Sequence, residues 1–127
     1  MLLYITLGTN DLDRSRRFYD AVMPAIGMHF VHADDAEFGF TRRGEARTRF
    51  WVTKPFDGKP ATIGTGSMVA LETESRAAVD AFYQAALAHG GSDEGAPGLR
   101  PYHENFYACY VRDPDGNKLS AVCERAE

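Results

Sequence analysis

The sequence is poor in cysteine, with only Cys109 and Cys123 among its 127 residues. Both lie in apolar stretches typical of strands, so we expect reduced, buried thiols, with a disulfide between them as the alternative. No apolar run approaches the roughly 18–20 residues that a membrane-spanning helix needs. Residues 1–6 have neither the basic segment nor the small-residue cleavage site of a signal peptide. We therefore expect a cytoplasmic protein with no membrane partner.

Basic residues are also few: the chain has 14 Lys and Arg against 18 Asp and Glu, which gives a net charge of −4. An acidic balance argues against nucleic acid as a partner. Hydrophobic residues make up 44% and aromatics 12%, which is typical of a folded chain and argues against disorder. The length suits one domain that buries its core without metal or disulfides. These features together indicate an enzyme or a binding protein that acts on a small organic molecule.

The sequence matches itself when it is displaced by 64 residues, about half of its length. A repeat of this kind indicates two copies of one structural unit within the chain. The match places Ile5 on Val69, Leu7 on Leu71, Thr9 on Thr73, Phe18 and Tyr19 on Phe82 and Tyr83, and Gly27 on Gly91.

Each half carries the same predicted order of a strand, a helix and three strands. In the first half Asn10 or Asp11 caps the helix, which Pro24 ends; in the second Ser75 caps it and Gly90-Gly91 end it. The predicted strands span 3–7, 28–31, 37–41 and 47–53, then 67–72, 105–112 and 118–123, with 93–102 a loop or an irregular edge strand.

This order predicts an α+β fold of two tandem βαβββ modules within a single domain, 1–127. Module 1 covers about 1–56, a turn-rich linker about 55–64, and module 2 about 65–127. Each helix must cover one sheet face, which leaves the opposite face open. If the two half-sheets curve toward each other to form a curved mixed sheet with the helices outside, the open face lines a cleft.

Alternation along each strand separates the helix-facing side chains from those on the open face. In the first strand Leu3, Ile5 and Leu7 face the helix. A slip of one residue would invert such assignments, and 105–112 receives none because both of its faces carry aromatics. An aromatic lining with few polar groups is typical of small-molecule sites, although a second core or a dimer interface would use the same residues. The predicted open face carries Tyr4, Thr6, Arg49, Trp51, Met68, Ala70, Glu72 and Ser120.

Two motifs carry a family resemblance, namely 7–15 with the following Phe18-Tyr19, and 113–119, an Asp-Pro-Asp-Gly-Asn-Lys-Leu turn. Together with the repeat they resemble the vicinal-oxygen-chelate superfamily over essentially the whole chain. That superfamily contains glyoxalase I, bleomycin- and fosfomycin-resistance proteins, extradiol dioxygenases and methylmalonyl-CoA epimerase. The resemblance implies the fold, but the fold hosts several chemistries as well as plain binding, so function depends on the site.

In metal-dependent members, His or Glu side chains on the open face hold a divalent ion. The resemblance carries those four positions onto Tyr4, Trp51, Met68 and Ser120. None is a His, Asp, Glu or Cys, the side chains that divalent metals prefer. We therefore predict no metal site and no cofactor, with a relocated divalent ion as the open alternative.

His103, in the loop 101–104, is the best candidate general acid or base, because its ordinary pKa is near neutrality. Tyr4 and Glu72 are further candidates for proton transfer, and Tyr102 joins the ligand-binding candidates. Arg49 could pair with a carboxylate or phosphate of a ligand.

Three of the four histidines receive no site role. His29 and His32 are three apart on one strand and should point to opposite faces, so they could not chelate together. His89 lies at a helix end, where a surface role is expected.

Three functions are compatible with these residues. The first is a metal-free protein that binds a small organic ligand at Tyr4, Thr6, Arg49, Trp51, Met68, Ser120 and Tyr102. The second is a lyase, isomerase or dioxygenase that acts on a small oxygen-bearing substrate, with a metal or with His103 as acid/base. The third is a subunit-interaction role, since members of the superfamily often form homodimers and a homodimer is expected here.

Overall fold

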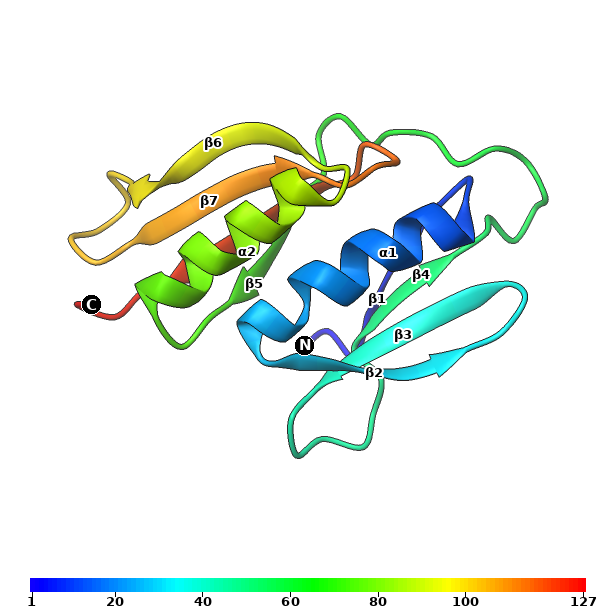
Figure 1. Ribbon diagram of the computed structural model, residues 1–127, viewed down its shortest axis with the longest axis horizontal. Helices are drawn as coiled ribbons and strands as arrows, with labels where there is room; N and C mark the ends of the chain where they lie inside the picture. Colours follow the sequence, from blue (N-terminus) through cyan, green and yellow to red (C-terminus); the bar gives the residue numbers. More distant parts are fainter.

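The computed structural model describes residues 1–127 and contains the predicted βαβββ order twice. The two modules lie side by side, with α1 over the first sheet and α2 over the second (Figure 1). No helix is long and apolar enough to cross a membrane. The elements are β1 Ile5–Gly8, α1 Leu12–Val22, η1 Pro24–Ile26, β2 Met28–Ala33, β3 Glu37–Arg42, β4 Phe50–Thr53, β5 Val69–Glu72, α2 Arg76–Ala88, β6 Ser92–Leu99, β7 Tyr107–Arg112 and β8 Lys118–Cys123.

Both helices begin at side-chain caps and end where their sequences require it. The Asp11 carboxylate accepts a hydrogen bond from the Arg14 backbone N–H, and the Ser75 hydroxyl accepts one from Ala78. Such caps satisfy backbone donors that the first turn of a helix leaves free. Pro24 opens a short 3₁₀ turn directly after α1, as expected for a residue that cannot continue the helix.

The strands form two separate four-stranded sheets, ordered β1-β4-β3-β2 and β5-β8-β7-β6. In each sheet one pair is parallel, β1 with β4 and β5 with β8, and the other pairs are antiparallel. The two mixed sheets are not joined into one ladder, since β1 and β5 are both edge strands and do not hydrogen-bond to each other. The α+β class and the tandem modules are confirmed.

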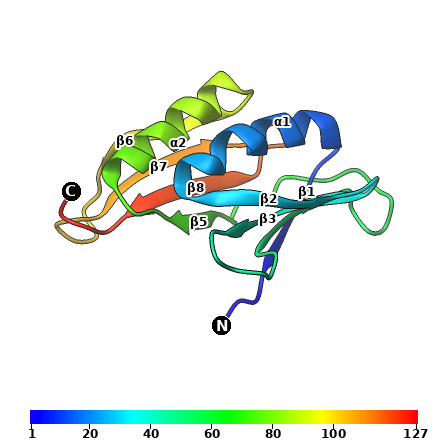
Figure 2. The same ribbon diagram turned by 60° about the horizontal axis from the view of Figure 1, so that its bottom comes forward.

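Both helices cover the same side of the sheets, while the N-terminus projects from the other side (Figure 2). Helix-facing side chains of both modules form one cluster of 19 buried residues. It contains Phe50 and Val52 of β4 and Leu119, Ala121 and Cys123 of β8, as alternation predicts. Leu3, predicted to face the helix, is instead 51% exposed, because β1 begins only at Ile5.

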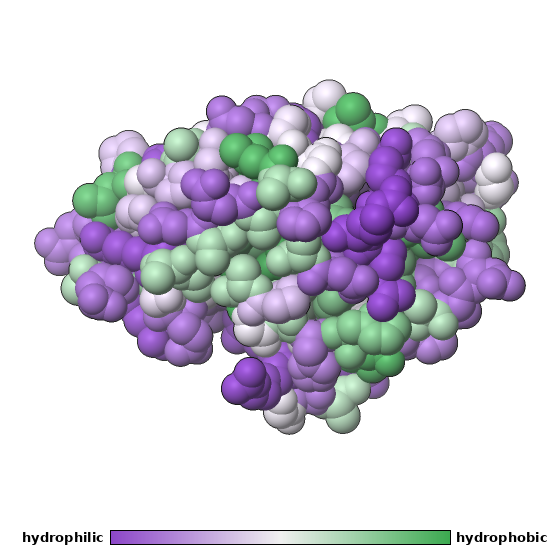
Figure 3. Space-filling view, viewed as in Figure 1, coloured by the Kyte–Doolittle hydropathy of each residue, from purple (hydrophilic) through white to green (hydrophobic).

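The outer surfaces of the two helices differ. Hydrophilic side chains dominate over α1, whereas paler and more hydrophobic residues follow α2 (Figure 3). The sequences explain this, because α1 contains three arginines and α2 contains six alanines. The modules thus share their inner packing but not their outer surface.

Strand boundaries and registers differ in places from the prediction. β4 begins at Phe50 rather than 47, so 43–49 forms a longer loop. β6 is the irregular edge strand that 93–102 allowed, with two interruptions of its register. In β2 a bulge lies between Phe30 and His32, so His29 pairs with Thr41 and His32 with Gly39. Residues opposite each other share a face, so His29 and His32 lie on the same face and the prediction of opposite faces is wrong.

The β7–β8 turn connects the modules. The Asp115 carboxylate accepts hydrogen bonds from the Thr9 hydroxyl (2.5 Å), the Asn10 backbone N–H (2.8 Å) and the Arg14 guanidinium (2.8 Å). Its side chain is only 2% exposed. The turn therefore holds the junction of β1 and α1 from the other half of the chain.

A second buried contact lies beneath this turn, where the Tyr19 hydroxyl donates to the Asp113 carboxylate at 2.6 Å. Burial raises the pKa of Tyr19, and the Asp113 carboxylate raises it further. Burial also raises the pKa of Asp113, although the hydrogen bonds it accepts from Tyr19 and Asn117 act in the opposite direction. The phenol therefore keeps its proton and remains a donor across the module boundary.

Candidate functional site

Trp51 lies at the centre of the open face of module 1. Strand register places it beside Thr6 of β1 and opposite Gly39 of β3. A β-carbon at position 39 would lie 2.9 Å from Cε3 of Trp51 and 2.5 Å from Cγ2 of Thr48. Glycine is therefore required for the indole to pack this closely against β3, and the ring forms the floor of this face.

A cavity of about 800 Å³ opens above this floor. Its volume is within the range of small-molecule pockets. Three predicted ligand-binding residues, Tyr4, Thr6 and Trp51, line it together. Four further residues complete the lining, namely Glu37, Ala46, Arg47 and Thr48.

The loop before β4 supplies most of the lining that sequence analysis missed. The Thr41 hydroxyl donates to the Arg47 carbonyl, and the Arg49 N–H donates to the Phe40 carbonyl. These bonds hold the loop against β3 instead of extending β4. Thr41 and Thr48 gave no sequence signal for this role, whereas alternation along β3 would have placed Glu37 with Gly39 on the open face.

Arg49 lies outside the Trp51 cavity, although it was predicted to bind ligand. Its guanidinium pairs with Glu45 at 2.6 Å and donates to the Leu3 carbonyl at 2.8 Å. It lines a neighbouring apolar groove between β1 and β5, together with Tyr4 and Ala70. The Arg49 guanidinium therefore already makes contacts within the protein, which leaves fewer of its donors for a ligand.

Glu72 lines the same groove and pairs with Arg42 at 3.3 Å. Both side chains are solvent-exposed, Glu72 to 75% and Arg42 to 49%. Met68 lies further along, in a small depression with Lys118. The structure thus separates these predicted residues from Trp51, so the open face is not one continuous site.

Ser120 occupies the position in module 2 that Trp51 occupies in module 1. It pairs with Ala70 in parallel and lies opposite Tyr110. The residue is buried, and its hydroxyl has no hydrogen-bond partner. Arg100 and Lys118 lie 5.3 and 5.7 Å from the centre of the Tyr110 ring. This face is therefore covered by side chains where module 1 is open.

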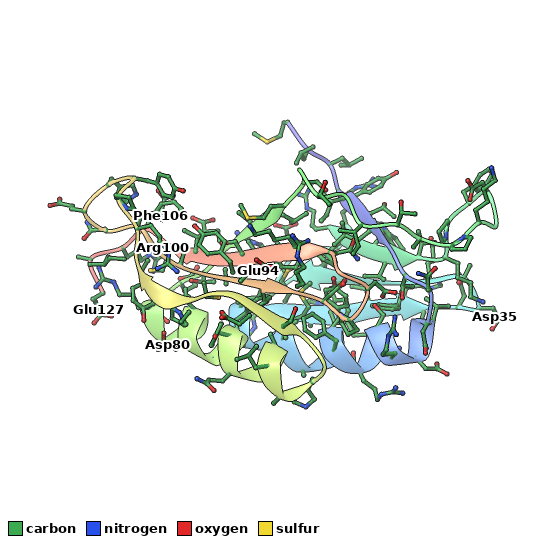
Figure 4. All side chains as sticks on the ribbon, turned by 90° about the horizontal axis from the view of Figure 1, so that it is seen from above. Asp35, Asp80, Glu94, Arg100, Phe106 and Glu127 are labelled. Carbon is green, nitrogen blue, oxygen red and sulfur yellow. The ribbon has the colours of Figure 1, made fainter.

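His103 and Tyr102 belong to the loop between β6 and β7. Arg100 and Phe106, which flank this loop, lie near Glu127 at one end of the molecule, and Asp35 lies at the other (Figure 4). Nε2 of His103 is 2.6 Å from the Glu124 carboxylate, and Nδ1 accepts a hydrogen bond from the Asn105 N–H. Neither His103 nor Tyr102 lines the Trp51 cavity.

The side chains at the superfamily's metal positions do not fit a divalent ion. Phenol, indole, thioether and hydroxyl groups stand at Tyr4, Trp51, Met68 and Ser120. Indole has no lone pair to donate, and a thioether is a soft ligand for hard cations. Elsewhere, no three His, Cys, Asp or Glu side chains come together as a metal site.

Both cysteines are free and buried. Burial raises the pKa of the Cys109 thiol to about 11, and the thiol lies on the helix-facing side of β7. A protonated, buried thiol is a poor nucleophile. Cys109 therefore belongs to the core and has no place in a catalytic site.

Comparison with known proteins agrees with this geometry. Residues 1–120 match the family model of the glyoxalase/bleomycin resistance protein/dioxygenase superfamily. No curated protein matches the chain. A solved glyoxalase/bleomycin resistance protein from Albidiferax ferrireducens T118 is 38% identical, with a TM-score of 0.83 over 94% of this chain and 95% of that chain.

More distant structures share the fold alone. A glyoxalase-related enzyme from Fulvimarina pelagi is 22% identical, with a TM-score of 0.75 over 97% of this chain and 87% of that chain. A fosfomycin resistance protein from Listeria monocytogenes is 17% identical, with a TM-score of 0.70 over 99% of this chain and 94% of that chain. On the family match and the modular structure together, the chain belongs to the glyoxalase/bleomycin resistance protein/dioxygenase superfamily.

Proposed function

We propose that this protein binds a small organic molecule in the Trp51 cavity without a bound metal ion. The observation that carries the proposal is the cavity itself, in which an indole, a phenol and a threonine hydroxyl converge beside Glu37 and Arg47. An aromatic lining with a few polar groups is the usual composition of a small-molecule site.

The side chains at the family metal positions support the metal-free part of the proposal. Trp51 and Tyr4 occupy positions at the cavity where metal-dependent relatives have metal-ligating side chains. They provide aromatic surface for stacking and one hydroxyl group instead. A ligand would therefore be held by stacking, by hydrogen bonds to Tyr4 and Thr6, and by charge at the rim.

Thermal unfolding tests both parts. We expect the midpoint to be the same in EDTA and with added Ni²⁺, Mn²⁺, Fe²⁺ or Zn²⁺. A ligand that binds only the native state adds about 2.7 kcal/mol at 100 times its dissociation constant, which shifts the midpoint by several degrees. A rise with one metal that EDTA abolishes would contradict the metal-free site.

Substitution of Trp51, the floor of the cavity, tests whether a stabilising compound binds there. Trp51→Ala should abolish the ligand-induced shift because it removes the stacking surface. Tyr102→Ala is the matched control, since Tyr102 is an aromatic residue that is 71% exposed and lies outside the cavity. Equal loss in both variants would contradict binding at Trp51.

Catalysis by His103 is the alternative function, and one observation favours it. The Glu124 carboxylate lies 2.6 Å from Nε2, and a carboxylate on one ring nitrogen is how a general base is commonly oriented. Nδ1 accepts a hydrogen bond from the Asn105 N–H and would have to release it to exchange a proton with a substrate. His103→Ala should abolish turnover of any substrate found if His103 is the acid/base. Unchanged turnover would remove this candidate.

We also propose a homodimer, supported by the apolar strand end that projects from the sheets. Leu2 and Leu3 are 76% and 51% exposed and line the groove between β1 and β5. Light scattering coupled to size-exclusion chromatography should give twice the monomer mass, and the double variant Leu2→Ser/Leu3→Ser should lower it. A monomeric wild-type protein would contradict the proposal.

A further inference from the structure

The Trp51 cavity contains one acid and one base that have no partner. Glu37 and Arg47 both line it, and neither belongs to any of the eight ion pairs in the protein. Their neighbours are paired, since His32 lies 3.0 Å from Asp34 and Arg49 lies 2.6 Å from Glu45. Two opposite charges therefore line one cavity without forming an ion pair with each other.

Strand geometry separates these two charges along the cavity. Glu37 begins β3, and the Thr41 hydroxyl on the same face holds the Arg47 carbonyl. Four residues of strand span roughly 14 Å at about 3.4 Å each. Gly39 lies between them, with the Trp51 ring against it. The backbone positions that carry the acid and the base therefore lie on opposite sides of the indole along β3.

We infer that the cavity recognises a zwitterion whose two charges flank a flat apolar body. The body lies on Trp51, the cationic group faces Glu37, and the acidic group faces Arg47. A guanidinium binds a carboxylate or a phosphate in a fork of two hydrogen bonds, which favours an acid at that end. The inference rests on the proposed function and specifies its ligand class.

A molecule with only one charge satisfies only one end of the cavity. Glu37 is half-buried and Arg47 is exposed, so each ion pair is partly screened by solvent. Exposed pairs of this kind give modest gains, so each charge should change affinity by roughly fivefold. Discrimination therefore comes from both ends acting on one rigid ligand.

Three compounds of nearly equal shape test the inference. The zwitterionic probe is 4-(aminomethyl)benzoate, 4-methylbenzoate lacks the amine, and 4-methylbenzylamine lacks the acid. Trp51 is the only tryptophan, so its emission reports on the cavity directly. We expect the zwitterion to bind at least roughly fivefold more tightly than either singly charged compound, with a weaker preference at high salt.

Two substitutions assign the ends. Glu37→Gln should remove the advantage of the zwitterion over 4-methylbenzoate and leave its advantage over 4-methylbenzylamine. Arg47→Gln should do the opposite. Asp35→Asn and Arg43→Gln are the matched controls, because they change the net charge equally but lie outside the cavity lining, and both should keep the wild-type preference.

The outcomes separate this inference from the proposed function. Equal affinity for all three compounds would overturn the zwitterion and leave the small-molecule cavity standing. Tighter binding of one singly charged compound would also overturn it. Unchanged Trp51 emission with all three at millimolar concentration would overturn the inference and count against the cavity as well.

Discussion

The two modules are alike on the side that faces the helices and different on the open side. Trp51 and Gly39 are opposite each other in module 1, and Ser120 and Tyr110 occupy the corresponding positions in module 2. The bulky residue is on β4 in module 1 but on β7 in module 2, and the small residue is on β3 in module 1 but on β8 in module 2. In module 1 the Trp51 ring lines an open cavity, whereas in module 2 Ser120 is buried. The repeated unit thus preserves its core and varies its open face, which is where function differs among superfamily members.

The largest expected loss of stability comes from substitution in the turn between β7 and β8, which joins the two modules. Asp115→Ala removes a buried acceptor from Thr9, Asn10 and Arg14, so we expect a loss of about 3 kcal/mol in unfolding free energy. Urea denaturation measures it.

Module 1 provides the matched control for this prediction. Arg42, at the end of β3, reaches Glu72 of module 2 only through an exposed ion pair. Arg42→Ala should therefore cost less than about 0.5 kcal/mol. Similar losses in the two variants would show that the modules hold each other symmetrically.

Filling position 39 should have the next largest effect. Gly39→Ala places a methyl group against Thr48 and the Trp51 ring, so we expect about 1–3 kcal/mol of destabilisation from overpacking. The indole must tilt, and Trp51 emission should shift. Gly66→Ala, in open space, is the control that should leave the emission unchanged. An unchanged Trp51 spectrum in Gly39→Ala would show that the ring does not depend on this glycine.

The opposite change is expected in module 2, where the Ser120 hydroxyl is buried without a partner. Ser120→Ala removes an unsatisfied polar group, so stability should stay the same or rise by up to about 1 kcal/mol. Thermal unfolding checks this. A loss of more than about 1 kcal/mol would mean that Ser120 makes a hydrogen bond that holds this face closed.

The smallest expected effect is at Cys109, the counterpart of Phe38 in the helix-facing core. Its pKa is raised by burial to about 11, so the thiolate stays rare below that pH and increases only as the pH rises toward it. Iodoacetamide at pH 8 should leave Cys109 unmodified in the native protein and modify it in urea, as mass spectrometry of peptides would show. Rapid native modification would place Cys109 outside the core.

Much of the fold could be predicted because it depends on local patterns. The caps at Asp11 and Ser75, the stop at Pro24 and alternation along β4 and β8 are properties of short segments. The 64-residue repeat then gave the second module from the first.

The candidate site was only partly predictable, because its remaining features depend on contacts between segments. The loop containing Arg47 joins the cavity through a hydrogen bond from Thr41, and the bulge in β2 brings His32 to within 6.1 Å of Trp51, measured between ring centres. The pairing of Arg49 with Glu45 likewise withdraws a predicted ligand-binding residue. None of these contacts leaves a periodic trace in the sequence.

The most direct test of an open module 1 and a closed module 2 is a ¹H–¹⁵N correlation spectrum during titration with 4-(aminomethyl)benzoate. The single indole N–H of Trp51 gives one resolved signal. We predict saturable shifts of this signal and of the amides of Gly39 and Thr48, with those of Tyr110 and Ser120 unchanged. Shifts centred on Tyr110 and Ser120, with Trp51 unaffected, would contradict the assignment of the binding site to module 1.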